Sequence, residues 1–582
     1  MLHSGLLALS VENGEMTLYE SKHMERLLIA DLSRMLSLTI KGEARCPVLI
    51  QVSQGETEIA LHFSGEGISS GEVLFRTVPG SGHLEMEISF LAAEDLELNR
   101  VSFFPEQTKT TFWDLVNFRN QHGRESTWPD LPFHDEIDTN TYSTDWQFAP
   151  HPTMMIFRKP ELSLLFGALE LPRDSFGMYL KANHYHIESW YLDYGRSGWG
   201  LELKKGTFYK LPRMCLLPEY TRDPHVIIRS WVQLLIEKKE IPDPRKIKRY
   251  PWHISHVYCT YQDYAYRKKK LIGEQLINGD LKAQSLSPTY LGDLETFCED
   301  ELTEELNLMQ KEELKFGIFI IDARWSVMRG VWRADPKRFP HLRQIIDRIH
   351  KMGMKVILWW GAFDIEKCCD VGENSKYLIA GGRRNRHGQQ MFDMSNPITQ
   401  EEFLKPLLHY FLSPDDGCLN ADGIKTDFMP DKIHDDMPPL DPAWRGEENY
   451  MFRFYALINR IATEIKPDFH HTAYVGHPWF VQHLHSNRTA DIQGSNPGEQ
   501  EARRKMLAAT SYGLPIWLDC HNWQDHIEEY YDLSRTTGCP VEIFSIQYIC
   551  RDYFSEPEQA PPSFYESLRG ILNEPLKVQK WE

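Results

Sequence analysis

The sequence of 582 residues is too long for one compact core, and its length predicts two or three domains. Its 83 acidic residues outnumber its 64 Lys and Arg, and the formal charge of −19 excludes the clustered basic surface by which proteins bind nucleic acid. No run of about 18 apolar residues is present, which argues against a membrane span. The N-terminal residues form neither a basic leader nor an apolar export segment, so we expect a cytoplasmic protein.

Residues 1–245 are predicted to form a β-sandwich domain that ends in a linker helix. Short runs in which apolar and polar side chains alternate, as at 59–63 and 84–90, are separated by Gly, Asn and Ser turns. Such strands bury one face, which favours a sandwich. Pro224 follows Asp223 and begins a helix whose apolar stripe consists of Val226, Ile227, Trp231, Leu234 and Leu235.

Residues 246–582 alternate between short apolar strands and amphipathic helices, which is typical of parallel strands joined by crossover helices. The helix expected within 340–353 shows this well, because its apolar residues share one face and Gly353 ends it. Eight strands close most economically into a barrel, and no Gly-rich phosphate loop favours an open nucleotide-binding sheet. The predicted fold is therefore multidomain, a β-sandwich followed by a (β/α)₈ barrel. The expected barrel strands lie within 253–261, 317–322, 355–360, 422–428, 470–476, 487–492, 514–519 and 542–548.

The sequence shows no pattern that calls for a cofactor or a metal. Its ten cysteines are scattered without a C-x-x-C pair, which predicts free thiols rather than a zinc or redox site. Aromatic residues make up 12% of the chain, and exposed rings stack well on the apolar faces of sugars. We therefore expect a carbohydrate partner and neither nucleic acid nor membrane, with homo-oligomer formation left open.

The candidate site lies at the carboxyl ends of the barrel strands, where barrel enzymes place their active sites. Residues i and i+2 of a strand share a face, so Lys425 is expected beside Asp427, and Asp322 beside Arg324. The Lys425 ammonium favours an ionised nucleophile at Asp427, whereas Asp491 has less cationic support and is free to act as an acid. The side chains predicted to bind substrate at these strand ends are Asp322, Trp325, Trp359, Trp360, Lys425, His477, Arg488, Asp519 and His521.

Two carboxyl groups in unequal surroundings match the chemistry of retaining glycoside hydrolysis. One carboxylate attacks the anomeric carbon, and the other protonates the leaving oxygen. Asp427 and Asp491 are therefore predicted to be the two catalytic residues.

The stretch ADGIKTDF at 421–428 resembles the nucleophile strand of the clan of retaining α-glycosidases that includes glycoside hydrolase families 31 and 36. Residues 321–360 resemble the clan's segment in which an acid and a Trp-ending strand contact sugar hydroxyls, and NRTADIQGSN at 487–496 resembles its acid/base strand. The resemblance implies a TIM-barrel enzyme with Asp427 as nucleophile and Asp491 as acid/base. It also implies an exo-acting α-glycosidase that hydrolyses a terminal α-linked glucose, xylose or galactose by double displacement.

Met429 stands where family 31 usually has a Glu, which marks a divergent member of the family.

Two other functions remain open on the residues alone. A metal-dependent barrel hydrolase would use His and Asp at the same strand ends, with Lys425 on the fourth strand. A non-catalytic carbohydrate-binding protein would use the same polar mouth only to hydrogen-bond hydroxyl groups. Chelator-insensitive activity would remove the first alternative, and hydrolysis of aryl α-glycosides would remove the second.

Overall fold

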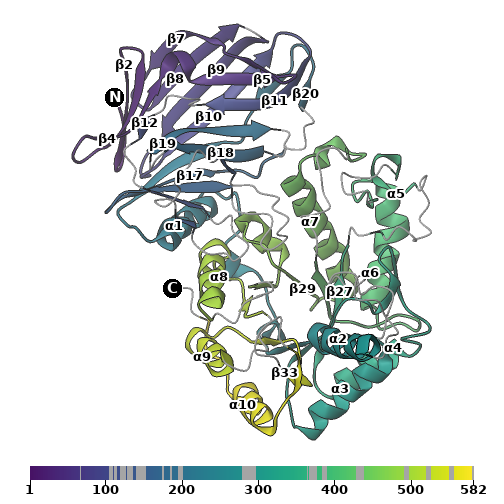
Figure 1. The fold of residues 1–582 in the computed structure, drawn as a ribbon. Helices are drawn as coiled ribbons and strands as arrows, with labels where there is room; N and C mark the ends of the chain where they lie inside the picture. The colour runs from purple at the N-terminus through teal and green to yellow at the C-terminus, as the bar shows by residue number, and fades with distance from the viewer. Residues whose placement is uncertain are drawn as a thin grey trace.

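The computed structural model of the protein describes most of the chain. The described residues are 1–579 except 66, 104–108, 111–113, 118–125, 128–135, 139–152, 174–175, 184–185, 195–200, 278–296, 363–364, 366–375, 383–389, 428–437, 490–496, 520–525 and 550–555. Antiparallel sheets form one end of the molecule and a parallel barrel forms the other (Figure 1).

The N-terminal region is built from three sheets in which every strand pair is antiparallel, as expected from the alternating sequence pattern. The first sheet has the order β1 (Leu2–Ser4), β2 (Leu7–Glu12), β3 (Glu15–Glu20), β4 (Glu25–Asp31) and β12 (Lys109–Thr110). The second has the order β14 (Ser126–Thr127), β13 (Asp114–Asn117), β16 (Met154–Arg158), β17 (Ser163–Ala168), β22 (Met214–Glu219), β10 (Leu84–Ala92), β9 (Ile68–Thr77), β8 (Glu58–Gly65) and β7 (Val48–Gln54), with β21 (Phe208–Lys210) beside β10. The third has the order β15 (Glu136–Asp138), β18 (Phe176–Asn183), β19 (His186–Tyr194), β11 (Leu96–Phe103), β5 (Leu36–Ile40) and β6 (Glu43–Arg45), with β20 (Leu201–Leu203) beside β11.

Strand β10 shows why these residues form strands that bury one face. Leu84, Met86, Ile88 and Phe90 alternate along it, and each is at most 2% exposed. Strand β8, which β9 separates from β10 in the same sheet, buries Ile59, Leu61 and Phe63 in the same core. The alternation of apolar and polar residues in the sequence therefore corresponds to a buried inner face of the sheet.

Helix α1 (Pro224–Glu237) connects the sheets to the barrel. The Asp223 carboxylate accepts a hydrogen bond from the His225 backbone N–H at 2.9 Å, which caps the helix as Asp and Pro at these positions predict. Trp231 donates to the carbonyl of Ala168 in β17 at 2.9 Å, and its ring contacts Trp479 of the barrel at 6.0 Å between centroids. The expected stripe is buried except for Val226, which is 43% exposed. The boundary near residue 245 stays a prediction.

The barrel contains all eight predicted parallel strands. Their order is β31 (Ile516–Trp517), β30 (Ser486–Arg488), β29 (His470–Ala473), β28 (Gly423–Thr426), β27 (Lys355–Trp360), β24 (Ile318–Ile321), β23 (Val257–Cys259) and β32 (Glu542–Ile543). A parallel bridge between Leu518 and Val541 joins the two end strands and nearly closes the ring. Strand β27 has its predicted bounds, whereas most of the other strands are shorter than predicted, as in β29, which spans His470–Ala473 of the predicted 470–476.

Helices and small hairpins surround the barrel (Figure 1). Helix α4 (Leu342–Lys351) buries Leu342, Ile345, Ile346 and Ile349 as predicted, and Gly353 at φ 85° follows it. The left-handed backbone at this turn favours glycine. The other α-helices and strands of this region, with the longest 3₁₀ helix, are α2 (Tyr261–Ile277), α3 (Glu299–Lys311), β25 (Ser326–Met328), β26 (Val331–Ala334), α5 (Pro397–Thr399), α6 (Lys405–Leu412), α7 (Glu447–Ile465), η9 (Pro478–His483), α8 (Pro497–Thr510), α9 (Ile527–Thr537), β33 (Tyr548–Ile549), β34 (Glu558–Gln559) and α10 (Pro562–Asn573).

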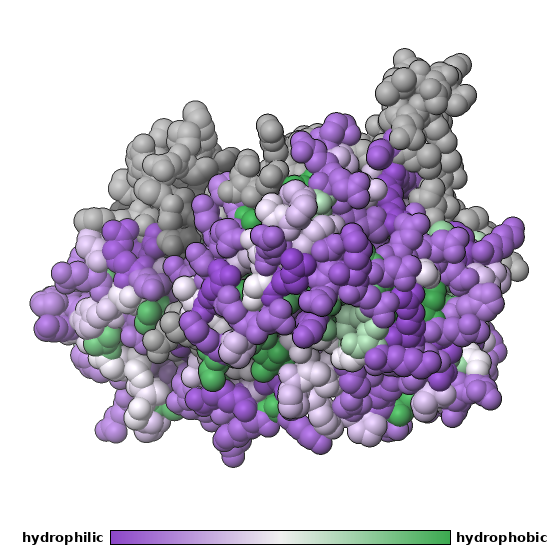
Figure 2. Space-filling model, turned by 90° about the horizontal axis from the view of Figure 1, so that it is seen from below, coloured by the Kyte–Doolittle hydropathy of each residue, from purple (hydrophilic) through white to green (hydrophobic). Residues whose placement is uncertain are grey.

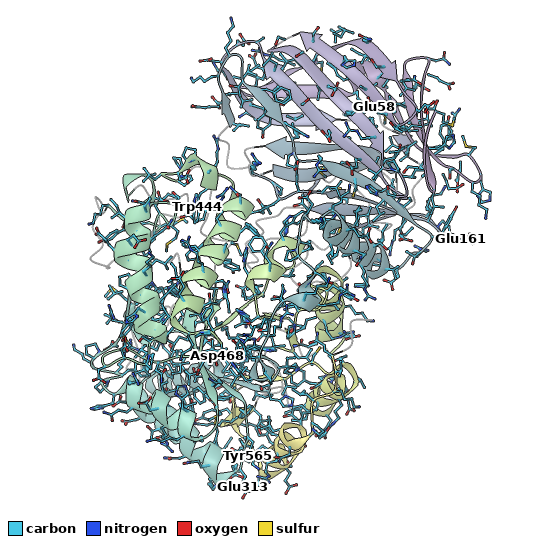
Figure 3. All side chains as sticks on the ribbon, turned by 180° about the vertical axis from the view of Figure 1, so that it is seen from behind. Glu58, Glu161, Glu313, Trp444, Asp468 and Tyr565 are labelled. Carbon is cyan, nitrogen blue, oxygen red and sulfur yellow. The ribbon has the colours of Figure 1, made fainter. Side chains whose placement is uncertain are left out.

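The carboxyl ends of the barrel strands face the N-terminal sheets. Trp444, which lies between β28 and α7, is on the side toward the sheets, whereas Asp468, directly before β29, lies toward the opposite end (Figure 3). The face in Figure 2 is mostly hydrophilic, with hydrophobic residues scattered across its coloured part. Among the helices that the structure describes, none combines the length and apolar character needed to cross a bilayer. All described cysteines, Cys46, Cys215, Cys259, Cys298, Cys418 and Cys539, are free thiols as predicted.

Candidate active site

Asp427 lies directly after β28, at the carboxyl end of the strand, and is half-buried. Its two carboxylate oxygens accept hydrogen bonds from different strands. The Trp359 indole N–H, from β27, donates to Oδ2 at 2.8 Å, and the Tyr474 hydroxyl, directly after β29, donates to Oδ1 at 2.6 Å. The carboxylate is thus fixed by both neighbouring strands while part of its surface stays accessible.

Lys425 does not form its ion pair with Asp427 as the sequence predicted. Its ammonium lies in the barrel interior, 3% exposed, and is 2.7 Å from Oδ2 of Asp322. Burial raises the pKa of Asp322, but Lys425 outweighs burial and holds this pKa below its ordinary value. Burial and Arg488 lower the pKa of Lys425, yet Asp322 and its other acidic neighbours raise it well above normal. Both groups are therefore charged.

Asp322 and Arg324 also depart from the predicted pairing. Strand β24 ends at Ile321, and Arg324 has φ 82°, so the i and i+2 rule for strands no longer applies there. The partners of Asp322 come from the barrel instead. They include the Cys259 thiol of β23 at 3.1 Å.

Arg488 and Asp519 form a second buried ion pair, between β30 and the end of β31. The Arg488 Nη1 atom is 2.6 Å from Oδ2 of Asp519, and both side chains are at most 1% exposed. Burial raises the pKa of Asp519 to about 7 although Arg488 opposes this, and the negative charges of Glu542 and Asp427 add to the rise. Asp519 therefore changes its protonation state near neutral pH.

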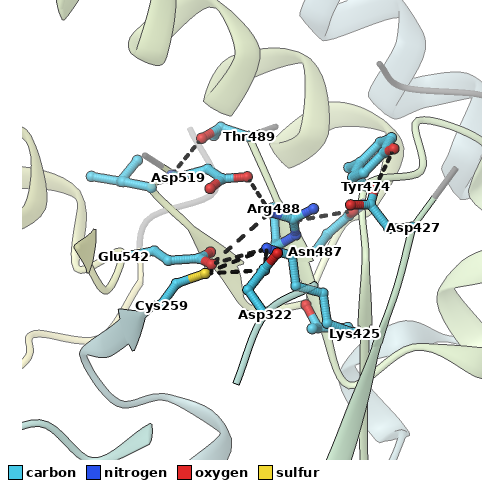
Figure 4. A network of polar contacts seen from close by, with 12 residues as sticks. Cys259, Asp322, Lys425, Asp427, Tyr474, Asn487, Arg488, Thr489, Asp519 and Glu542 are labelled. Carbon is cyan, nitrogen blue, oxygen red and sulfur yellow. Dashed lines mark hydrogen bonds and ion pairs between the residues drawn. The ribbon is translucent and has the colours of Figure 1, made fainter. Parts of the chain in front are cut away.

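Glu542 completes this group of charges and was missed by the sequence analysis. It is the first residue of β32, is fully buried, and places Oε1 3.8 Å from Lys425 Nζ and 4.0 Å from Arg488 Nη1 (Figure 4). A signal was available, because a glutamate within an otherwise apolar strand must have partners in the interior.

Tyr474 connects the buried charges to Asp427 (Figure 4). The Arg488 guanidinium carbon lies 5.1 Å from the centroid of the Tyr474 ring, within the range of a cation–π contact. The hydroxyl of the same ring holds Asp427. Tyr474 was not predicted, since nothing in the sequence distinguishes it from a core tyrosine.

Trp325 and Trp360 pack into the helix layer rather than beside Asp427. Trp325 is 0% exposed, donates to the Trp359 carbonyl at 2.9 Å, and contacts Phe411 of α6 at 5.5 Å. Trp360 is also 0% exposed and contacts Phe411 and Phe454 of α7, both at 5.9 Å. Neighbouring strand residues point to opposite faces, so only Trp359 of the Trp pair reaches the barrel mouth.

His477 lies where the barrel meets the N-terminal sheets. It is fully buried, its Nε2 is 3.4 Å from the Thr153 hydroxyl, and its ring contacts Trp479 at 5.1 Å. These contacts give it a role at the interface between the two regions.

Two predicted site residues, Asp491 and His521, lie outside the described residues, as does Met429. Their predicted roles stay predictions. In the part of the chain that the structure describes, no group of three His, Cys, Asp or Glu side chains is arranged to hold a metal ion.

A comparison with protein families finds one match, which lies within the barrel region. Residues 291–531 match the glycosyl hydrolases family 31 TIM-barrel domain. None of the curated proteins with which the chain was compared matches it in sequence.

Several solved structures share the overall fold. A family 31 sulfoquinovosidase from E. rectale, in complex with an aza-sugar inhibitor, has a TM-score of 0.57 and 11% identity over 97% of this chain and 82% of its own. The family 36 α-galactosidase AgaA from Geobacillus stearothermophilus has a TM-score of 0.56 and 10% identity over 92% and 74%. The α-galactosidase from Lactobacillus brevis has a TM-score of 0.54 and 14% identity over 92% and 72%. At these identities the likeness establishes the fold.

Proposed function

We propose that this chain, a divergent member of the glycoside hydrolase clan that includes families 31 and 36, is a retaining, exo-acting α-glycosidase. It removes a terminal α-linked glucose, xylose or galactose. Asp427 is the nucleophile and Asp491 is the acid/base residue. Raffinose and stachyose appear in complexes of family 36 AgaA variants, which supports a carbohydrate substrate here.

The arrangement around Asp427 is the observation that carries the proposal. A nucleophilic carboxylate must be held in one orientation, with a lone pair of one oxygen directed toward the anomeric carbon. Trp359 and Tyr474 each donate one hydrogen bond to it, from the strands on either side. A carboxylate oxygen has lone pairs beyond the one that such a bond occupies, so attack remains feasible.

The proposed reaction has two steps. Asp427 forms a bond to the anomeric carbon as the glycosidic bond breaks, and Asp491 gives its proton to the leaving oxygen. A water molecule next attacks the same carbon, gives its proton to Asp491 and releases Asp427. The cations Lys425 and Arg488 lie in the barrel interior next to this site and contribute fixed positive charge.

A panel of nitrophenyl α-glucoside, α-xyloside and α-galactoside tests the proposal. We expect the wild type to hydrolyse at least one of them, and Asp427→Asn to lower kcat/KM by at least about 10³-fold. Asp468→Asn is the matched control, because Asp468 belongs to the same barrel but lies toward its opposite end (Figure 3). Activity that survives in Asp427→Asn, or that is lost equally in Asp468→Asn, would contradict the assignment.

A further inference from the structure

Four charged side chains form one layer of the barrel interior. They come from every second strand in the barrel order, namely Asp322 directly after β24, Lys425 on β28, Arg488 on β30 and Glu542 on β32. Layers of four side chains from alternate strands are the normal packing unit of such barrels, and branched apolar residues ordinarily fill them. Apolar packing, which ordinarily explains such a layer, does not explain one made of charged side chains.

The layer holds two carboxyl groups and two cations, and Asp519 adds a further carboxyl group 2.6 Å from Arg488. Asp322 lies against Lys425 at 2.7 Å. Glu542 lies between the cations, with its Oε1 3.8 Å from Lys425 Nζ and 4.0 Å from Arg488 Nη1. Its side chain is fully buried, so water does not screen these interactions as it does at a surface. Without the Glu542 carboxylate, only Asp322 and Asp519 would offset the repulsion between the two cations.

Arg488 connects this layer of charged side chains to the nucleophile Asp427. The guanidinium of Arg488 lies against the Tyr474 ring, and the Tyr474 hydroxyl holds Asp427. Any movement of Arg488 toward or away from Lys425 therefore moves the group that orients the nucleophile.

We propose that Glu542 is a positioning residue of the active site, whose carboxylate balances Lys425 and Arg488 and so fixes the support of Asp427. This inference rests on the proposed function, because it assigns Glu542 to the same reaction. The backbone of Glu542 is held independently, since its N–H donates to the Tyr530 hydroxyl of α9 at 3.2 Å. Among the described residues, the charged or titratable side chains that interact with the Glu542 carboxylate include Lys425, Arg488, Asp519 and Cys259, with Asp322 behind Lys425.

The variant Glu542→Gln tests the inference, because it keeps the shape of the side chain and removes its charge. We expect kcat on the best nitrophenyl glycoside to fall about tenfold or more with a smaller change in KM, since the orientation of the nucleophile is affected rather than substrate binding. The charge of Glu542 raises the pKa of Asp519, so Asp519 in Glu542→Gln should ionise at lower pH than in the wild type, as the pH profile of stability measures. The variant Glu542→Asp keeps the charge and should restore part of kcat.

Glu305→Gln is the control for replacing a buried glutamate by its amide away from the site, since burial and Asp263 raise the pKa of Glu305 well above normal and the change removes no charge there. Glu305 on α3 is also fully buried, but it belongs to a separate cluster with Asp263 and Arg267. We expect this variant to leave kcat and the pH profile as in the wild type. A wild-type kcat and pH profile in Glu542→Gln, or the same change in Glu305→Gln, would overturn the inference.

A stability measurement tests the charge balance without reference to activity. We expect Lys425→Met and Glu542→Gln each to lower the unfolding temperature, and the double variant to unfold at a higher temperature than the sum of both losses predicts, because it is neutral again. If the losses in unfolding temperature of the two single variants simply add in the double variant, the charges of Lys425 and Glu542 do not offset each other, and the inference is overturned. If the double variant shows this non-additive unfolding temperature but the wild type hydrolyses no glycoside, the charge interaction is confirmed and the proposed function fails.

Discussion

The variant Asp519→Asn offers a quantitative test of the buried charges, through the dependence of stability on pH. Burial raises the pKa of Asp519 to about 7 in the folded protein, against an ordinary value near 3.9 in an unfolded chain. Between these values the folded protein binds one proton more than the unfolded chain does. The stability contributed by Asp519 is therefore fully present below about pH 4 and is lost as the pH rises through about 7.

The magnitude follows from the size of the shift. One pKa unit corresponds to about 1.4 kcal/mol, so the free energy of unfolding should lose about 3 kcal/mol through this group between pH 5 and pH 8. Asparagine cannot titrate. The difference in the free energy of unfolding between wild type and Asp519→Asn should thus fall by about 3 kcal/mol over that range, as measured by urea denaturation at each pH.

Asp422→Asn is the control for this measurement. Burial raises the pKa of Asp422, but His350, Lys466 and Lys355 outweigh burial and hold the pKa far below its ordinary value. The stability that Asp422 contributes by its own ionisation is present above the unfolded pKa and is lost only in strong acid, so Asp422 itself does not titrate between pH 5 and pH 8. A flat difference for Asp519→Asn as well would refute the reasoning, because it would mean that Asp519 is ionised throughout.

Three further predictions concern catalysis. Asp427→Ala should regain part of its activity when azide is added, because azide can attack the exposed anomeric carbon; no rescue at any azide concentration would argue against a nucleophilic role. Asp491→Ala should retain more activity on aryl glycosides with good leaving groups than on poor ones, since good leaving groups need little protonation; equal losses on all of them would contradict the acid role. Tyr474→Phe should lower kcat about 10- to 100-fold, because it removes one hydrogen bond to the Asp427 carboxylate. An unchanged kcat in this last variant would show that the bond does not matter in the transition state.

The most apolar barrel strands, such as β24 and β27, could be predicted from the sequence because each is a short apolar run that is buried on both faces. The alternating strands of the N-terminal sheets could be predicted for a related reason, since one face is buried and the other is polar. The ends of the strands were predicted less accurately. Near Arg324, for example, β24 has already ended and the backbone is left-handed.

The partners within the site could not be predicted in the same way. The rule that residues i and i+2 share a face correctly places Lys425 in the barrel, but it does not say which acid lies across the interior. Closure of the ring brings Asp322, Arg488 and Glu542 together from positions far apart in the chain. The same rule, applied to Trp359 and Trp360, would have shown that only one of them faces the site.

Trapping of the covalent intermediate tests the central claim most directly. The enzyme is incubated with a fluorinated glycosyl fluoride of the preferred sugar, which forms the intermediate faster than water releases it, and the digested protein is then analysed by mass spectrometry. We predict one sugar per chain, attached to the peptide that carries Asp427. A sugar attached to any other carboxylate, or turnover without an adduct and with inversion at the anomeric carbon, would contradict the account.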